Sequence, residues 1–272
     1  MRFLSTRRRH PLAGAIVLLF GLVAVGGLYS AFAPRSAVAD TAQTDVVAQG
    51  RQLFLVGCAS CHGKNAQGVL TDRGTNYGPS LVGVGAAAVD FQVGTGRMPL
   101  TQAGPQAAQK PTVYTDSEVS ALAAYIASLA PGPAIPDASA VSIDGADVAR
   151  GGEFFRTNCT TCHNSVGAGG ALPSGRYAPA LNGVTARHIY EAMLTGPQQM
   201  PVFSDAVITP QDKRDIIAYI KTIQSQPAYG GDPEGGLGPV SEGLAIWVVG
   251  MGALVAIATW IGAHGVRAGK KK

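Results

Sequence analysis

The stretch Cys58-Ala59-Ser60-Cys61-His62 occurs a second time as Cys159-Thr160-Thr161-Cys162-His163. Both copies read C-x-x-C-H, the signature at which a haem of the c type is attached. Each thiol can add to one vinyl group of the porphyrin, and on a helix the positions i, i+3 and i+4 share one face. The motif therefore predicts a porphyrin held by two thioethers, with His62 or His163 already placed against its iron.

Two other readings of a C-x-x-C pair are a redox dithiol and a zinc site. A dithiol of the thioredoxin type needs a βαβ pattern, which the sequence does not show. A zinc ribbon places its two C-x-x-C arms roughly 15–20 residues apart, and these arms are far more widely separated. The four motif cysteines are also all the cysteines in the chain. We therefore expect two covalently bound haem c groups, attached through Cys58 and Cys61 and through Cys159 and Cys162.

The composition indicates a protein with membrane segments. The 272 residues are 46% hydrophobic and only 14% charged, which is a low charged fraction for a purely soluble protein. The net charge is +4, and many basic residues lie at the two ends of the chain beside apolar runs. This distribution does not resemble a nucleic-acid interface, and no nucleic-acid partner is expected.

The two apolar runs are residues 12–33 and 243–263. Each is long enough to cross a bilayer as a helix. The first is either a secretory signal, cleaved after Ala33 or Ala39, or an uncleaved anchor, and its length favours the anchor. Basic residues flank both runs, which predicts that both termini are cytoplasmic and that the intervening chain lies on the outer side of the plasma membrane.

An internal repeat divides the exported part of the chain into two domains. The sequence Tyr77-Gly78-Pro79-Ser80-Leu81 is repeated as Tyr177-Ala178-Pro179-Ala180-Leu181. Gly50 and Gly151 are also equivalent, and we expect them to let the first and last helices of each domain cross closely. The predicted boundaries are a basic start and signal or anchor (1–39), domain 1 (40–130), a Pro-rich semi-rigid linker (131–146), domain 2 (147–226), a flexible tether (227–242), a transmembrane helix (243–263) and a basic tail (264–272).

Domain 1 is expected to end in a helix that buries Leu122, Tyr125, Ile126 and Leu129, which recur at helical spacing. Asp116 or Ser117 is the expected N-cap of this helix. Domain 1 also has an insertion, Thr101–Pro111, that domain 2 lacks. It is either a tolerated surface insertion, the more ordinary interpretation, or a docking loop for a partner.

The sixth ligand of each iron is expected to be a methionine. Met98 and Met200 occupy equivalent places in the two repeats, and each is followed by proline. Although methionine usually packs in a core, the repeated position favours ligation here. Met193 aligns with Phe91 and is expected in the core. His188 is expected at the surface or beside a haem propionate. Four further side chains could pair with the propionates or could simply be exposed polar residues: Tyr77, Tyr177, Arg97 and Arg187.

With histidine and methionine ligation, both irons are six-coordinate and closed. A closed iron favours outer-sphere electron transfer over chemistry on a bound substrate. A haem peroxidase would need one open or displaceable position, and the paired Met-Pro motifs argue against it.

Over roughly residues 45–225 the chain resembles tandem class I cytochrome c domains. The expected fold is therefore mainly α, with these two domains between N-terminal and C-terminal transmembrane helices. The whole arrangement is similar to the dihaem cytochrome cc subunit of the actinobacterial menaquinol–cytochrome c reductase, the cytochrome bcc complex. The resemblance implies that Cys58, Cys61, Cys159 and Cys162 attach haem and that the irons are ligated by His62, Met98, His163 and Met200.

The same resemblance implies the partners. In that family the subunit receives electrons from the Rieske iron–sulfur subunit, beside a cytochrome b subunit, and passes them to the copper centre of a haem-copper oxidase. The chain would thus belong to a quinol–cytochrome c reductase and carry out no substrate chemistry by itself. The alternative function is a dihaem electron-transfer subunit of a periplasmic dehydrogenase.

Overall fold

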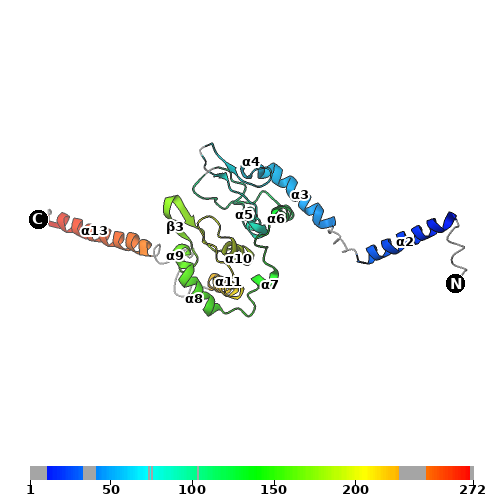
Figure 1. Ribbon diagram of the computed structural model, residues 1–272. Helices are drawn as coiled ribbons and strands as arrows, with labels where there is room; N and C mark the ends of the chain where they lie inside the picture. The colour runs from blue at the N-terminus through cyan, green and yellow to red at the C-terminus, as the bar shows by residue number, and fades with distance from the viewer. Residues whose placement is uncertain are drawn as a thin grey trace. The chain divides into compact units, whose positions relative to one another are not determined.

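The computed structural model describes residues 11–32, 41–72, 74, 76–102, 104–226 and 243–269. Contacts divide the chain into one unit from Met1 to Asp45 and another from Val46 to Lys272. The first unit contains helix α2 (Pro11–Phe32), whose described side chains are exposed, and the start of α3 (Thr41–Gly57). The chain is mainly helical, as the sequence predicts (Figure 1).

Among the described residues, one helix, Gly243–His264, is long and apolar enough to cross a membrane, judged by length and composition. None of its residues is buried, and it includes a π-helical turn, Ile246–Met251, and the larger part of α13 (Gly252–Gly269). The apolar part of α2, Gly14–Tyr29, is shorter. Two spanning helices were expected, and the N-terminal one therefore stays a prediction.

The first repeat folds around its last helix. Leu122, Tyr125 and Ile126 are at most 5% exposed and pack with Phe54 of α3, and Leu129 packs against the same cluster but is only partly buried. The predicted apolar face is confirmed for the first three residues. The N-cap is Thr115, whose hydroxyl accepts a hydrogen bond from the Glu118 amide in a capping box, and the expectation of Asp116 or Ser117 is wrong. The elements of this repeat are α3, α4 (Ala59–His62), β1 (Val69–Leu70), β2 (Asn76–Gly78), α5 (Gly85–Gly94) and α6 (Asp116–Leu129).

The second repeat has the same order of elements. Phe155 of α8 packs against Ile216, Ile217 and Ile220 of the last helix, α11. In both repeats a short antiparallel hairpin follows the C-x-x-C-H motif. The elements are α8 (Val148–Asn158), α9 (Thr160–His163), β3 (Gly170–Leu172), the 3-10 turn η1 (Pro173–Gly175), β4 (Arg176–Ala178), α10 (Ala186–Thr195) and α11 (Pro210–Ser225).

Glycine permits the closest helix crossing in each repeat. A Cβ atom on Gly50 would overlap the carbonyl oxygen of Ala121 in α6, and one on Gly151 would overlap the carbonyl oxygen of Asp215 in α11. Both contacts are with backbone atoms, which cannot rotate away as a side chain can. The expected role of these two glycines is confirmed.

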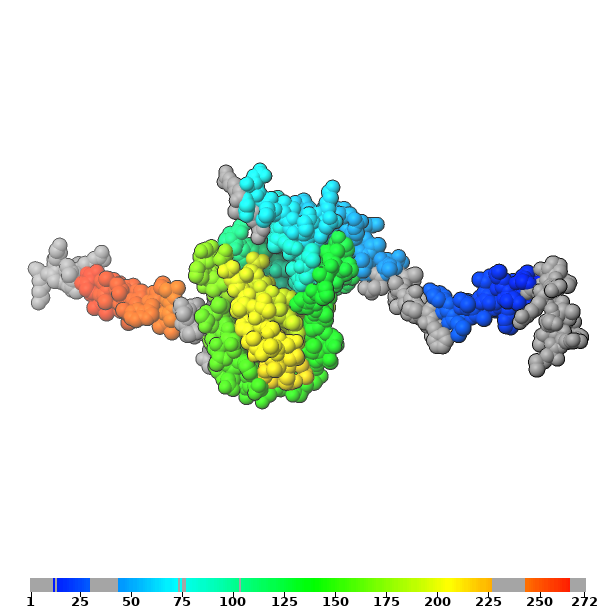
Figure 2. Space-filling view, in the orientation of Figure 1, coloured from blue at the N-terminus to red at the C-terminus, as the bar shows by residue number. Residues whose placement is uncertain are grey.

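The repeats also contact each other directly. Helix α5 of the first packs against α10 of the second, and Figure 2 shows residues of the first repeat (cyan) against those of the second (green and yellow). The segment 131–146 includes a helical turn, α7 (Ala138–Val141), and is held by Arg214, which donates to the carbonyls of Ser142 and Asp144, each at 2.9 Å. It is therefore a packed connection and not only an extended linker.

Candidate haem-binding sites

Each C-x-x-C-H motif forms a single helical turn at the end of a longer helix. The amide nitrogens of Cys61 and His62 donate to the carbonyl of Cys58 at 3.1 and 3.0 Å, and the second motif repeats this pattern at 3.2 and 2.9 Å. None of the four cysteines forms a disulfide. The turn places both thiols and the histidine of each motif on adjacent positions of one surface, as the spacing predicts.

The two motif histidines are oriented by proline carbonyls. His62 Nδ1 lies 2.7 Å from the carbonyl oxygen of Pro79, and His163 Nδ1 lies 3.0 Å from that of Pro179. A carbonyl can only accept, so Nδ1 carries the proton and Nε2 keeps its lone pair. This is the arrangement by which proteins fix a metal-binding imidazole. Both prolines belong to the repeated stretch Tyr77–Leu81 and Tyr177–Leu181, but the sequence alone does not show that their carbonyls face the histidines.

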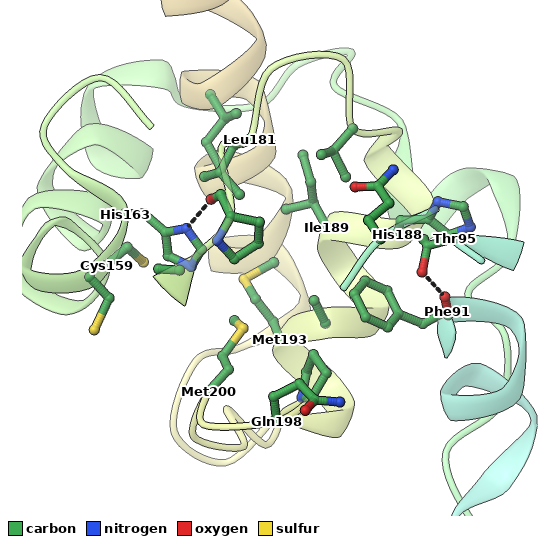
Figure 3. A pocket seen from close by; sticks show the side chains of 18 of the residues that line it. Phe91, Thr95, Cys159, His163, Leu181, His188, Ile189, Met193, Gln198 and Met200 are labelled. Atoms are coloured by element: carbon green, nitrogen blue, oxygen red, sulfur yellow. Dashed lines mark hydrogen bonds between the residues drawn. The ribbon is translucent and has the colours of Figure 1, made fainter. Parts of the chain in front are cut away.

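A cavity of about 350 Å³ lies beside the second motif. Its lining includes Cys159, Cys162, His163 and Met200, together with apolar side chains such as Leu181 (Figure 3). Cofactor sites are typically apolar cavities of about 300–1,000 Å³ with a few placed polar groups. A cavity of this size, with two thiols and an imidazole in its wall, fits a haem c.

Two methionines of the second repeat reach this cavity. Met193, on α10, is 2% exposed within the core cluster, whereas Met200 is partly buried and lies in the loop before Pro201. Figure 3 shows both side chains near His163. In the first repeat Met98 also packs against the core, and the place equivalent to Met193 is Phe91. The repeat therefore continues to favour Met200 as the iron ligand, and this assignment stays a prediction.

Burial favours the neutral forms of the first cysteine of each motif and of His163. It raises the pKa of the Cys58 thiol to about 11 and that of the Cys159 thiol to about 11, with a further contribution from the second cysteine of each motif. Burial also lowers the pKa of His163, partly offset by its hydrogen bond to Pro179. A neutral imidazole is the form that binds a metal.

The first repeat forms part of the wall of the second cavity. Phe91, Arg97, Gln106 and Gln109 line it together with the second motif. Arg97 is 7% exposed, and its guanidinium lies 4.8 Å from the centre of the Phe91 ring. The ion pairs among the described residues do not include Arg97. A buried guanidinium needs an anionic partner, and the propionates of a bound haem would supply one.

The other propionate candidates differ from Arg97. Tyr77 is 62% exposed and Tyr177 is 43% exposed, although Tyr177 borders the cavity. Arg187 is exposed and forms an ion pair with Asp90 of the first repeat, with Nε 3.2 Å from Oδ2. His188 lies between the repeats, with its side chain 17% exposed. The expectation of exposed polar surface thus fits Tyr77 but is wrong for Arg97.

The insertion in domain 1 docks onto the second repeat. We name residues 104–111 the strap. Gln106 exchanges two hydrogen bonds with the backbone of Tyr177, at 2.8 and 2.9 Å. The carbonyl of Pro105 accepts from Arg176 at 3.1 Å, and the Ala107 amide donates to Gln198 at 3.3 Å. The insertion thus lies largely at the surface, as the ordinary interpretation expects, but it contacts the second repeat of the same chain, and Gln106 and Gln109 line the cavity beside the second motif.

Replacing Gln106 with Ala is expected to loosen the strap. It removes both hydrogen bonds to Tyr177, a loss of about 1–3 kcal/mol if each contributes its usual net amount. Hydrogen–deuterium exchange should show the Tyr177 amide exchanging roughly tenfold faster or more. Gln102→Ala, on the same segment but outside the strap, is the control. Equal exchange rates in both variants would mean that the strap does not hold the two repeats together.

The chain matches known protein families along both repeats. Residues 47–130 match the family described as "Cytochrome c". Residues 146–220 match the family described as "Cytochrome C oxidase, cbb3-type, subunit III". The two C-x-x-C motifs thus lie in two cytochrome c domains, which suggests two haems c.

Whole-chain relatives cover both repeats at once. The chain is 47% identical over 273 residues to the "Cytochrome bc1 complex cytochrome c subunit" of Corynebacterium diphtheriae, covering 94% of this chain and 95% of that protein. It is 46% identical over 273 residues to the protein with the same description from Corynebacterium efficiens, covering 94% and 90%. For Mycobacterium tuberculosis strain H37Rv the identity is 45% over 265 residues, covering 95% and 93%.

Proposed function

Because the chain belongs to the family of actinobacterial cytochrome bc1 complex cytochrome c subunits, we propose that it is a membrane-anchored dihaem cytochrome. It relays electrons from the Rieske centre of a menaquinol-oxidising complex to the copper centre of a haem-copper oxidase. The observation that carries this proposal is the duplicated imidazole geometry. Each motif histidine has its Nδ1 proton committed to a proline carbonyl, and its Nε2 is thereby left for iron.

The proposed residues divide into anchors and ligands. Cys58 and Cys61 attach the first haem, and Cys159 and Cys162 attach the second. Bound haem supplies an iron that gains and loses one electron. His62 and Met98 would hold that iron in the first domain, and His163 and Met200 would hold it in the second.

The protein contributes a closed site of fixed geometry. The histidine tautomer is held by Pro79 or Pro179, so the ligand need not reorganise when the iron changes its charge. The apolar wall around the second site, including Leu181 and Ile189, excludes water and holds the ligands in place. The two domains contact each other through α5 and α10, which favours transfer between the haems within one chain.

We further propose that the domains run from 40 to 130 and from 147 to 226. The helix Gly243–His264 and the N-terminal apolar run (12–33) both span the plasma membrane. Basic residues at the two ends would keep both termini cytoplasmic, with the haem domains on the outer side. The names of the relatives support a cytochrome b subunit and a Rieske subunit as partners more than they support the alternative of a periplasmic dehydrogenase.

Purification of the full chain from native membranes tests this function. We expect it to co-purify with b haem, an iron–sulfur protein and a copper-containing oxidase, and to keep haem on a denaturing gel because the attachment is covalent. The control is the double variant Cys58→Ala with Cys61→Ala, which should halve the haem retained per chain. Recovery with a flavin or quinone dehydrogenase in place of these partners would contradict the proposal.

A further inference from the structure

Three metal-ligating side chains meet where the two repeats touch. Asp90 comes from α5 of the first repeat, and His188 and Glu191 come from α10 of the second. One ligand atom from each lies within 4.8 Å of those of the other two. The spacing of His188 and Glu191, i and i+3, places both on the face of α10 that packs against α5.

The two carboxylates are buried, His188 is partly buried, and the three side chains make few hydrogen bonds. Asp90 is 4% exposed and Glu191 is 0% exposed. Four buried atoms of the trio have no hydrogen-bond partner: Asp90 Oδ2, His188 Nε2, Glu191 Oε1 and Glu191 Oε2. Asp90 Oδ2 does have the Arg187 guanidinium at 3.2 Å, whereas Glu191 has only the Asp90 carboxyl beside it, a group that can share a proton with Glu191 but cannot balance its charge. Buried polar atoms without partners are costly and need an explanation, such as an ion that completes them.

We propose that Asp90, His188 and Glu191 form a binding site for a divalent transition-metal ion of the zinc class. One imidazole nitrogen with carboxylate oxygens is a ligand set that zinc commonly takes. The imidazole argues against calcium and magnesium, which bind oxygen ligands. Once Glu191 has lost its proton, two carboxylates and the Arg187 guanidinium give the site a net negative charge, which favours a bound cation.

The site has room and access for its remaining ligand. A second cavity, of about 160 Å³, adjoins it and is lined by Asp90, Arg187, His188 and Asp116 among others. Three protein ligands leave one position of a tetrahedral ion for water, and this cavity supplies the space. The ion would also tie the repeats together, because its ligands come from both.

A proton competes with the metal ion for the Glu191 carboxylate. Burial and the neighbouring Asp90 carboxylate raise the pKa of Glu191 to about 9, with Arg187 acting in the opposite direction. Burial lowers the pKa of His188, where Asp90 opposes the shift and both Arg187 and Arg97 reinforce it. Without a metal ion, the first shift favours the protonated form of Glu191 and the second favours the neutral form of His188. Metal binding must then release the Glu191 proton, and the affinity should rise with pH up to about 9.

Zinc titration of the haem-loaded full chain, first treated with a chelator, tests the site. Isothermal titration calorimetry should show one equivalent of Zn²⁺ bound, with release of about one proton found by comparing buffers of different ionisation enthalpy. Zinc-edge X-ray absorption should show an imidazole in a shell of nitrogen and oxygen ligands at about 2.0–2.2 Å. This second readout separates the site from loose binding to surface carboxylates.

His188→Ala and Glu191→Gln should each weaken zinc binding about a hundredfold or more, since loss of an outer partner alone costs about 10–100-fold. Asp116→Asn, in the wall of the adjoining cavity but outside the trio, is the matched control and should change affinity little. The haem spectrum checks that each variant is folded. Failure to bind one equivalent, binding that survives both substitutions, or a spectrum without imidazole would overturn the proposal. These measurements use the chain by itself, so their outcome is independent of the co-purification that tests the proposed function.

Discussion

Met200→Leu is expected to lower the reduction potential of the second haem by about 0.1 V or more, since axial ligands span about 0.8 V in haem proteins. A thioether sulfur is a soft ligand that favours ferrous iron, and removing it also opens the sixth position. Leucine has a similar volume and is apolar, so the cavity wall should hold at a cost below about 1.5 kcal/mol. A redox titration measures the shift, and carbon monoxide binding to the reduced protein reports the open iron.

Met193→Leu is the matched control, because Met193 lines the same cavity. It should leave the potential nearly unchanged and the iron closed to carbon monoxide. The reverse result, with Met193→Leu opening the iron and Met200→Leu leaving it closed, would transfer the ligand role to α10. Met98→Leu should produce the same changes at the first haem alone, which would assign each step of the titration to one domain.

Most of the features predicted correctly from sequence occur in both repeats. The spacing of C-x-x-C-H predicts the helical turn that the structure has at both motifs. The paired glycines predict the two close crossings, because a position that is glycine in both repeats marks a shared backbone constraint. Helical periodicity similarly predicts the buried face of Leu122, Tyr125 and Ile126.

The features that were missed depend on contacts between distant parts of the chain. The strap reaches Tyr177 across 71 residues of sequence, and a Gln/Ala/Pro segment has no periodicity that would indicate this. Asp90 and Glu191 likewise look like surface acids on their own helices until α5 and α10 pack together. The oxygen acceptors for the histidines are backbone carbonyls, which residue types do not specify.

Gly151→Ala is expected to destabilise the second domain by as much as about 3 kcal/mol, the upper end of the usual cost of overpacking. The added Cβ would overlap the backbone of α11 at Asp215, so α8 and α11 must separate. Those helices carry Phe155 and Ile216, both at most 1% exposed. Alanine has a higher helix propensity than glycine by about 1 kcal/mol. The measured loss of unfolding free energy is therefore the cost of the clash minus that gain. Thermal unfolding of the full chain, followed by circular dichroism, measures it.

Gly152→Ala, one residue later, separates the clash from the general effect of filling a helical glycine. Its Cβ would lie 3.0 Å from side-chain atoms of Arg156 and Tyr219, which can shift, and its propensity gain is the same as that of Gly151→Ala. We expect it to cost clearly less. Gly50→Ala should reproduce the larger effect in the first domain, since that Cβ would meet the Ala121 backbone. If Gly151→Ala and Gly152→Ala unfolded at the same temperature, the close approach of α8 and α11 would not be what requires glycine at this crossing.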